Sequence, residues 1–216
     1  MGAITRSIAN NITTSGVFTS SAITNASVTG ITVLANAPAD GITLISSQTA
    51  SNSASLSFTS GLTSTYKAYK FVFVNINPAT DEAAFSFNMS TDGGSNYNVT
   101  KTTTVFETYH DEADTNTSLS YKTNFDLAQS TDFQRIAMEI GNGADESASG
   151  SLIIFNPSST VYVKHFIASS NIYQVNNYSF NYYTAGYGNT TSAVNAVRFQ
   201  MSTGNFDGVI YLYGIK

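Results

Sequence analysis

From Ile42 onward, apolar and polar residues alternate with the period of two that is typical of β-strands. Gly, Asn and Pro turns separate many of these runs, which include ITLISSQ, ASLSFTS, YKAYKFVFVNI, AFSFNMS, YNVTKTTTVF, TVYVKHFIAS and GVIYLYGI. Helical periodicity is nearly absent, and roughly ten strands without intervening helices favour antiparallel pairing. The sequence therefore predicts an all-β fold, an antiparallel two-sheet sandwich of jelly-roll type with an extended N-terminal arm.

Residues 1–40 differ from the rest, being rich in Ser, Thr, Ala and Asn and poor in aromatic residues. The stretch NAPADG, Asn36 to Gly41, joins a proline to Asp-Gly turn chemistry and marks the boundary. We expect residues 1–40 to form an attachment arm and residues 41–216 to form the β-sandwich domain. The candidate attachment residues are the isolated apolar residues of the arm, Ile4, Ile8, Ile12, Val17, Phe18 and Ile23.

Four local predictions follow from pattern and turn chemistry. The run KFVFVNI is apolar on both faces, which predicts a central strand with Phe71, Phe73 and Asn75 on one side. The stretch STDGGSNY predicts a tight hairpin loop. Residues 107–133 have little alternation, so we expect a long excursion with one short helix. The last residues, 198–216, predict a hairpin that turns at Gly204 to Gly208.

Composition excludes several classes of protein. Charged residues make up only 11% of the chain, its net charge is -5 and its pI is about 4.8, so nucleic-acid binding is not expected. With no cysteine, disulfides and thiolate zinc sites are excluded. Neither a signal peptide nor a long apolar run is evident, which predicts synthesis in the cytosol and no membrane insertion.

The best candidate for chemistry is YHDEAD, Tyr109 to Asp114, where one His and three carboxylates lie within six residues. Its spacing lacks the frame of a calcium loop, so a solvated acidic loop is the favoured interpretation and a metal site the open alternative. Signatures of hydrolases, metalloproteases and nucleotide-binding proteins are missing. We therefore predict no catalytic, cofactor-binding or metal residue, no cofactor and no enzyme; a polysaccharide depolymerase using these acids is the remaining enzymatic alternative.

A tyrosine-rich segment, NIYQVNNYSFNYYTAGY, interleaves aromatic residues with Asn. Exposed aromatic rings with amide neighbours suit stacking on sugar rings or contact with another protein. Strand alternation separates Tyr182 from Tyr183, so half of these residues are expected in the core. The candidate partner or glycan face consists of Tyr173, Tyr178, Tyr182, Tyr183 and Tyr187.

Several stretches carry a resemblance that spans nearly the whole chain. They are ITRSIANNITTSG, SSAITNASVTGIT, YHDEADT, DLAQSTDFQ, FNPSSTVYVKHF and TAGYGNTTSAVNAVRFQMSTGNFDGVIYLYGIK. With these, the chain resembles virion structural proteins of marine tailed bacteriophages, a group of capsid-decoration and fibre-like β-sandwich proteins. The resemblance implies a non-enzymatic component of the virion, made in the host cytoplasm.

The function expected from the sequence is therefore that of a bacteriophage virion structural protein. We expect a capsid decoration or head-fibre protein that attaches through its arm and displays the sandwich on the particle surface. The alternative is a tail-fibre or receptor-binding carbohydrate-binding module. The expected partners are other virion proteins of the capsid or tail, further copies of the chain in a homo-oligomer such as a trimer, and a host-surface glycan.

Overall fold

The computed structural model describes residues 41–216, which contain twelve β-strands and no α-helix. None of these residues forms a helix that could span a membrane. The predicted attachment residues Ile4, Ile8, Ile12, Val17, Phe18 and Ile23 lie outside the described residues. The strands are β1 (Ile42–Ser53), β2 (Ser55–Phe58), β3 (Ala68–Pro78), β4 (Ala83–Ser90), β5 (Lys101–Asp111), β6 (Thr117–Tyr121), β7 (Gln134–Ile140), β8 (Ala148–Phe155), β9 (Lys164–Gln174), β10 (Tyr178–Gly188), β11 (Ala196–Met201) and β12 (Phe206–Ile215).

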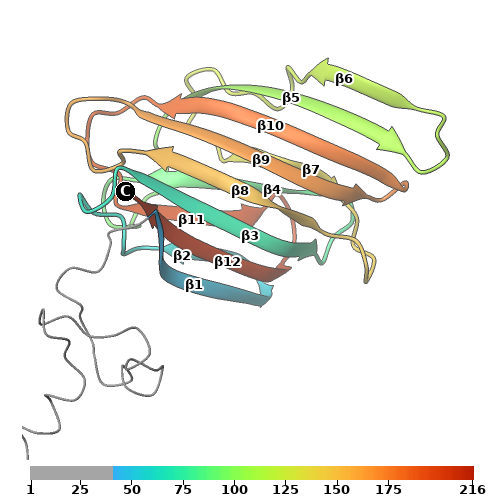
Figure 1. Cartoon of the computed structure of the whole chain (residues 1–216), viewed down its shortest axis with the longest axis horizontal. Coiled ribbons are helices and arrows are strands. Elements are labelled where there is room, and N and C mark those ends of the chain that lie inside the picture. The colour runs from blue at the N-terminus through green and yellow to red at the C-terminus, as the bar shows by residue number, and fades with distance from the viewer. Residues whose placement is uncertain (1–40) are drawn as a thin grey trace, which may run out of the picture. The chain divides into compact units, whose positions relative to one another are not determined.

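Nine strands form a nearly closed, barrel-like sheet in the order β1-β12-β3-β8-β9-β7-β4-β11-β2 (Figure 1). Every pairing is antiparallel, so the prediction of an all-β antiparallel domain is confirmed. The join between β9 and β7 is a single pair, Ile140 with Gln174. The two ends of the path, β1 and β2, approach each other, and the Gln48 side chain on β1 donates a hydrogen bond of 2.9 Å to the Ser57 carbonyl on β2.

The remaining three strands extend the sheet beyond β9, where β10 pairs with β9, β5 with β10 and β6 with β5. They lie along the top of Figure 1, and β6 ends the extension as an edge strand. The register between β9, β10 and β5 is unbroken along the full length of β10. The extension is therefore a continuation of the layer that contains β1, β12, β3 and β8.

An aromatic cluster fills the core. The ring of Phe199 lies within 6.4 Å, centroid to centroid, of the rings of Phe58, Phe71, Phe85 and Phe87. All five side chains are at most 2% exposed. Alternation along β2, β3, β4 and β11 places these rings on the inner face of their strands, and burial of such large apolar surfaces is the main force that closes the layers.

The strand β3 lies between β12 and β8, which confirms its predicted central position. Phe71 and Phe73 share one side as predicted and are buried there, but Asn75 is exposed and adopts a positive φ of 52°. A register shift between Phe73 and Ile76 accompanies this residue and leaves Ile76 fully buried. The expectation that Asn75 shares a side with Phe73 is wrong, because a bulge interrupts the alternation of β3.

Three other local predictions are wrong. The strands β11 and β12 do not form a terminal hairpin, because β11 pairs with β2 and β4 whereas β12 pairs with β1 and β3. The Asp-Gly-Gly turn likewise joins β4 to β5 without pairing them. Between residues 107 and 133 there is no helix; β5 continues to Asp111 and β6 follows. Both turns connect strands whose hydrogen-bonding partners are distant in sequence.

Candidate functional site

The outward side of β8, β9, β10, β5 and β6, here called the outer face, is the most distinctive surface of the described residues. Residues on β9 alternate strictly between buried and accessible positions, and β10 and β5 follow in register. The accessible set contains six large apolar side chains that are 40–69% exposed: Phe106, Leu119, Tyr121, Phe155, Ile167 and Tyr183. A sheet layer that faced only water would carry polar residues at these positions.

The predicted tyrosine face divides between the two sides of the sheet. Tyr173, Tyr183 and Tyr187 lie on the outer face, where Tyr183 is 40% exposed. Tyr182 is fully buried, and the partly buried Tyr178 packs against the core. The period-2 pattern separates neighbouring residues in this way, so only three of the five candidate residues share the outer face.

An aromatic pair stands near the middle of the outer face. Tyr183 on β10 and Phe106 on β5 are register partners whose rings stack 4.9 Å apart at 16°. Tyr121 on β6 is paired with Phe106 in turn. Beside this row, the small side chain of Ala185 leaves two hollows of about 210 and 400 Å³, both bordered by Ile167. The outer face thus combines protruding aromatic and aliphatic groups with adjacent shallow depressions.

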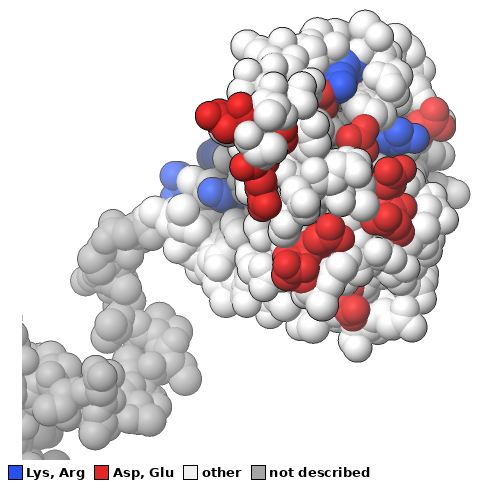
Figure 2. All heavy atoms as spheres, turned by 90° about the vertical axis from the view of Figure 1, so that its right-hand side faces the viewer, with Lys and Arg blue, Asp and Glu red and all other residues white. Residues whose placement is uncertain are grey.

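At the outward-facing positions of its five strands, the outer face has no Asp, Glu, Lys or Arg; the charged residues of β5 and β9 face inward. Six acids instead gather at one end of the strands, in the connections that follow β3, β5 and β7. Register brings these connections to the same end, where the acids are Asp81, Glu82, Glu112, Asp114, Asp145 and Glu146. Figure 2 shows Asp and Glu side chains gathered over this end of the molecule. Charge and apolar surface are thus segregated.

The acidic loop YHDEAD begins within β5 rather than as a free excursion. Asp111 accepts hydrogen bonds of 2.8 Å from the amides of Thr115 and Asn116, and one from the Thr115 hydroxyl. The Thr115 hydroxyl and the Asn116 amide are the main causes that lower the pKa of Asp111 to about 2. His110 and Asp114 form an exposed pair 3.0 Å apart. Across residues 41–216, no three His, Asp or Glu side chains come together as metal ligands would.

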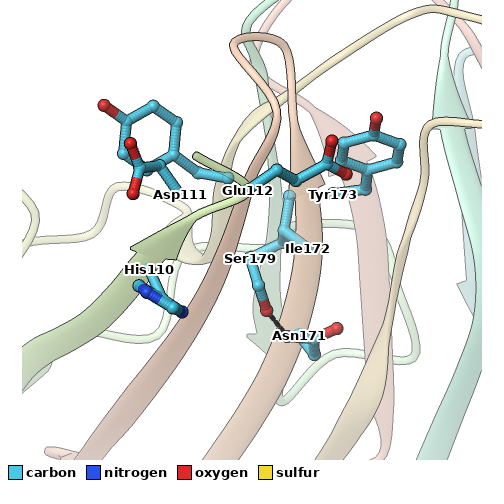
Figure 3. Close-up of a pocket in the computed structure, with 8 residues that line it drawn as sticks. His110, Asp111, Glu112, Asn171, Ile172, Tyr173 and Ser179 are labelled. Carbon is cyan, nitrogen blue, oxygen red and sulfur yellow. Dashed lines mark hydrogen bonds between the residues drawn. The ribbon is translucent and has the colours of Figure 1, made fainter. Parts of the chain in front are cut away.

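A pocket of about 320 Å³ lies at this end, between β5, β9 and β10 (Figure 3). In Figure 3, Glu112 extends toward Tyr173, and Asn171 donates a hydrogen bond of 3.1 Å to the Ser179 hydroxyl. The pKa of Tyr173 is raised by desolvation and then by the negative charge of Glu112. The pocket is open, and more of its lining is apolar than polar.

Sequence reasoning missed a buried polar group beneath the outer face. Glu107 on β5 is 1% exposed, and its Oε1 lies 2.5 Å from Nζ of Lys122. Its register partner Tyr182 is 0% exposed, and the Tyr182 hydroxyl has no hydrogen-bond partner. Burial, and then the charges of Glu107 and Glu139, raise the pKa of Tyr182. The alternation of VFETYH could have signalled that Glu107 shares the inner face with Val105.

Glu139 completes this group from β7. It has a positive φ of 58° beside a register shift in the β4–β7 pair. Burial first, and then the negative charge of Glu107, raise the pKa of Glu139, whereas Lys122 opposes the change. Two carboxylates in such surroundings can exchange protons, but Glu107 is too deeply buried for a polysaccharide to reach both of them.

Comparison with models of known protein families, with curated proteins and with solved structures found no match to this chain.

Proposed function

We propose that this chain is a bacteriophage virion structural protein, a capsid decoration or head-fibre protein. In this proposal residues 1–40 attach it to the particle, and residues 41–216 form a jelly-roll sandwich displayed on the particle surface. The strand order is the observation that carries the proposal. The resemblance of the sequence to virion proteins of marine tailed phages supports the same assignment.

Strand order favours a jelly roll over other β-sandwiches. Eight strands form two sets, β1-β12-β3-β8 and β2-β11-β4-β7. Each consecutive pair, β1 and β2, β3 and β4, β7 and β8, β11 and β12, places one strand in each set. This is the winding of a double Greek key, which viral capsid and lectin domains use. In this description β5-β6 and β9-β10 are two inserted hairpins that widen one layer.

The outer face supports a role in assembly rather than in chemistry. A chain of net charge -5 that has no Asp, Glu, Lys or Arg at the outward-facing positions of these five strands has a surface suited to burial against protein. Charged residues are depleted at the centres of protein interfaces, where aromatic residues are enriched. The apolar residues and tyrosines of the outer face match that composition.

Particle incorporation tests the proposed attachment. Phage that express a chain without residues 2–36 should contain none of it, although the purified truncated protein remains folded and soluble. A finer variant replaces Ile4, Ile8 and Ile12 with Ser, and its matched control replaces Asn10 and Asn11 with Ser. Normal incorporation of the truncated chain would refute attachment through this segment.

A carbohydrate-binding module is the second candidate, and one observation favours it. The 400 Å³ hollow places the hydroxyls of Thr102 and Thr104 and the ring of His165 around the apolar groups of Phe155 and Ile167. Aromatic and aliphatic surface with nearby polar groups suits a sugar ring. Lectin domains also use jelly rolls.

A glycan array distinguishes this candidate. The test variant is Tyr187→Ala, because Tyr187 borders the hollow whereas Tyr182 is buried in the core. Tyr162→Ala, an exposed tyrosine in the connection between β8 and β9, is the control. A glycan signal lost in the first variant and kept in the second supports sugar binding, and the absence of any signal for the unaltered protein contradicts it.

A further inference from the structure

The outer face has the properties of a protein interface rather than of a water-exposed sheet. Its six large apolar side chains are 40–69% exposed, and a fully accessible side chain of this kind offers about 150–250 Å². Together they expose on the order of 600 Å², the upper end of the largest patch on a typical monomer. The polar neighbours on the same strands, mostly Thr, Ser and Asn, bring this surface near the roughly 800 Å² that one partner buries in a stable complex.

Charge indicates which partner fits. Two copies of a chain with net charge -5 repel each other unless the surfaces that meet are neutral, since like charges brought together cost several kcal/mol. The outward-facing positions of β8, β9, β10, β5 and β6 carry no formal charge, whereas six acids gather at one end of the strands. Two acids lie beside this face, Asp114 next to His110 and Asp126, which accepts a hydrogen bond of 2.6 Å from the Tyr121 hydroxyl. A second copy can meet the rest of the outer face through uncharged residues.

Shape supports the same partner. The most protruding groups, Leu119 at 69% and Tyr121 at 50% exposure, stand on the edge strand β6. The hollows lie two to three strands away, beside Ile167 and Ala185. A twofold arrangement that lays one outer face over another can place the projections of each copy in the hollows of its partner. Such self-complementarity is what an isologous dimer requires.

We propose that the outer face is the self-association surface of this protein, buried in solution against the outer face of a second copy. Leu119 and Tyr121 on β6, and Phe106, Ile167 and Tyr183 behind them, are the contact residues. This inference rests on the proposed function in that it names the partner of a face assigned to assembly. Leu119 projects from the edge strand β6, away from the hollow that could hold a sugar, and such an exposed aliphatic side chain favours a protein partner.

The test measures the mass of the full-length chain by light scattering and sedimentation equilibrium across a wide range of protein concentration. The unaltered protein should have at least twice the 23.0 kDa mass of one chain. The double variant Leu119→Ser, Tyr121→Ser should weaken association by about tenfold or more for each residue, the effect of losing 1.4 kcal/mol apiece. Both side chains are at least half exposed and lie on an edge strand, and the bond that the Tyr121 hydroxyl donates to Asp126 is at the surface, so the fold should tolerate the change.

A second variant and a control keep the test decisive. Ile167→Thr retains a β-branched residue at the centre of the face and should also weaken association. Tyr162→Ser, 69% exposed but in the connection between β8 and β9, should leave the mass unchanged. If the unaltered protein is a monomer at all concentrations, the inference is wrong. This holds also if residues 1–40 or a glycan covers the outer face instead. An oligomer that none of the outer-face variants weakens also overturns the inference.

Failure of this inference is distinguishable from failure of the proposed function. A chain that is monomeric in solution yet incorporated into particles would remove the self-association surface and leave the virion assignment standing. A stable homo-oligomer that is absent from particles would leave the self-association surface standing and remove the virion assignment.

Discussion

Lys101 gives a prediction about stability that depends on its burial. The side chain is 0% exposed, and its Nζ donates hydrogen bonds of 2.7 Å to Asn88 Oδ1 and to the Val99 carbonyl. Burial lowers the pKa of Lys101 from 10.5 to about 7, and the negative charge of Asp132 only partly opposes this. The folded protein thus holds at neutral pH a lysine that readily loses its proton.

Linkage between proton binding and folding sets the direction and size of the effect. Between about pH 7 and 10.5 the unfolded chain keeps the Lys101 proton while the folded chain releases it, so the free energy of unfolding rises with pH. From pH 7 to about pH 9 the two pKa values give an increase of about 2 kcal/mol from this residue. Below pH 7 both states are protonated, and the full cost of burying the charge remains.

Urea denaturation between pH 7 and 9 measures this effect. The Lys101→Met variant should lose about 2 kcal/mol of the rise in unfolding free energy that the unaltered protein shows. Part of the rise should persist, because Lys164 is also 0% exposed and burial lowers its pKa as well. Lys67→Met, at an exposed lysine, is the control and should keep the full rise. Equal pH dependence in Lys101→Met and the unaltered protein would refute the reasoning.

Three further outcomes are expected from single substitutions. Phe199→Ala should lower the free energy of unfolding by about 3–5 kcal/mol in urea denaturation, because it empties the centre of the aromatic cluster; a loss under 1 kcal/mol would contradict this packing. Tyr182→Phe should raise the melting temperature slightly, because the buried hydroxyl lies near the Glu107 carboxylate without the geometry of a hydrogen bond, and an unmade hydrogen bond costs about 1–3 kcal/mol. A fall in melting temperature would show that the hydroxyl is bonded to Glu107. Asp111→Asn should reduce the loss of stability on acidification from pH 4 to 2, measured by circular dichroism. The reason is that the pKa of Asp111 is lowered from 3.8 to about 2, so its carboxylate stabilises the fold only while it is ionised. An acid transition that does not change in the variant would argue against this role.

Alternation of residue types predicted the strands well, because it depends on neighbours along the chain. Spacing alone put Phe71 and Phe73 on the same side of their strand, and the pattern around Tyr178 correctly separated Tyr182 from Tyr183. Asn75 was misplaced because a bulge shifts the alternation by one residue, and its positive φ leaves little trace in the sequence.

Turn chemistry was less informative than alternation. Asp-Gly-Gly and Gly-Asn-Phe-Asp-Gly both reverse the chain, but a turn can deliver the next strand to its neighbour or to the opposite set of strands. Here β4 is followed by β5 on the extension, and β11 by β12 in the other set. The choice depends on which apolar faces are buried together, and the residues on those faces are far apart in sequence.

The sequence by itself determined an all-β antiparallel domain, the division of each regular strand into two sides and a chain poor in charge. Only the tertiary structure decided the strand order, the burial of Lys101, Lys164 and Glu107, and the separation of a neutral outer face from an acidic end. The physical reason is range: alternation is set by a local period of two, whereas strand partners and the surroundings of a charge are set by long-range packing.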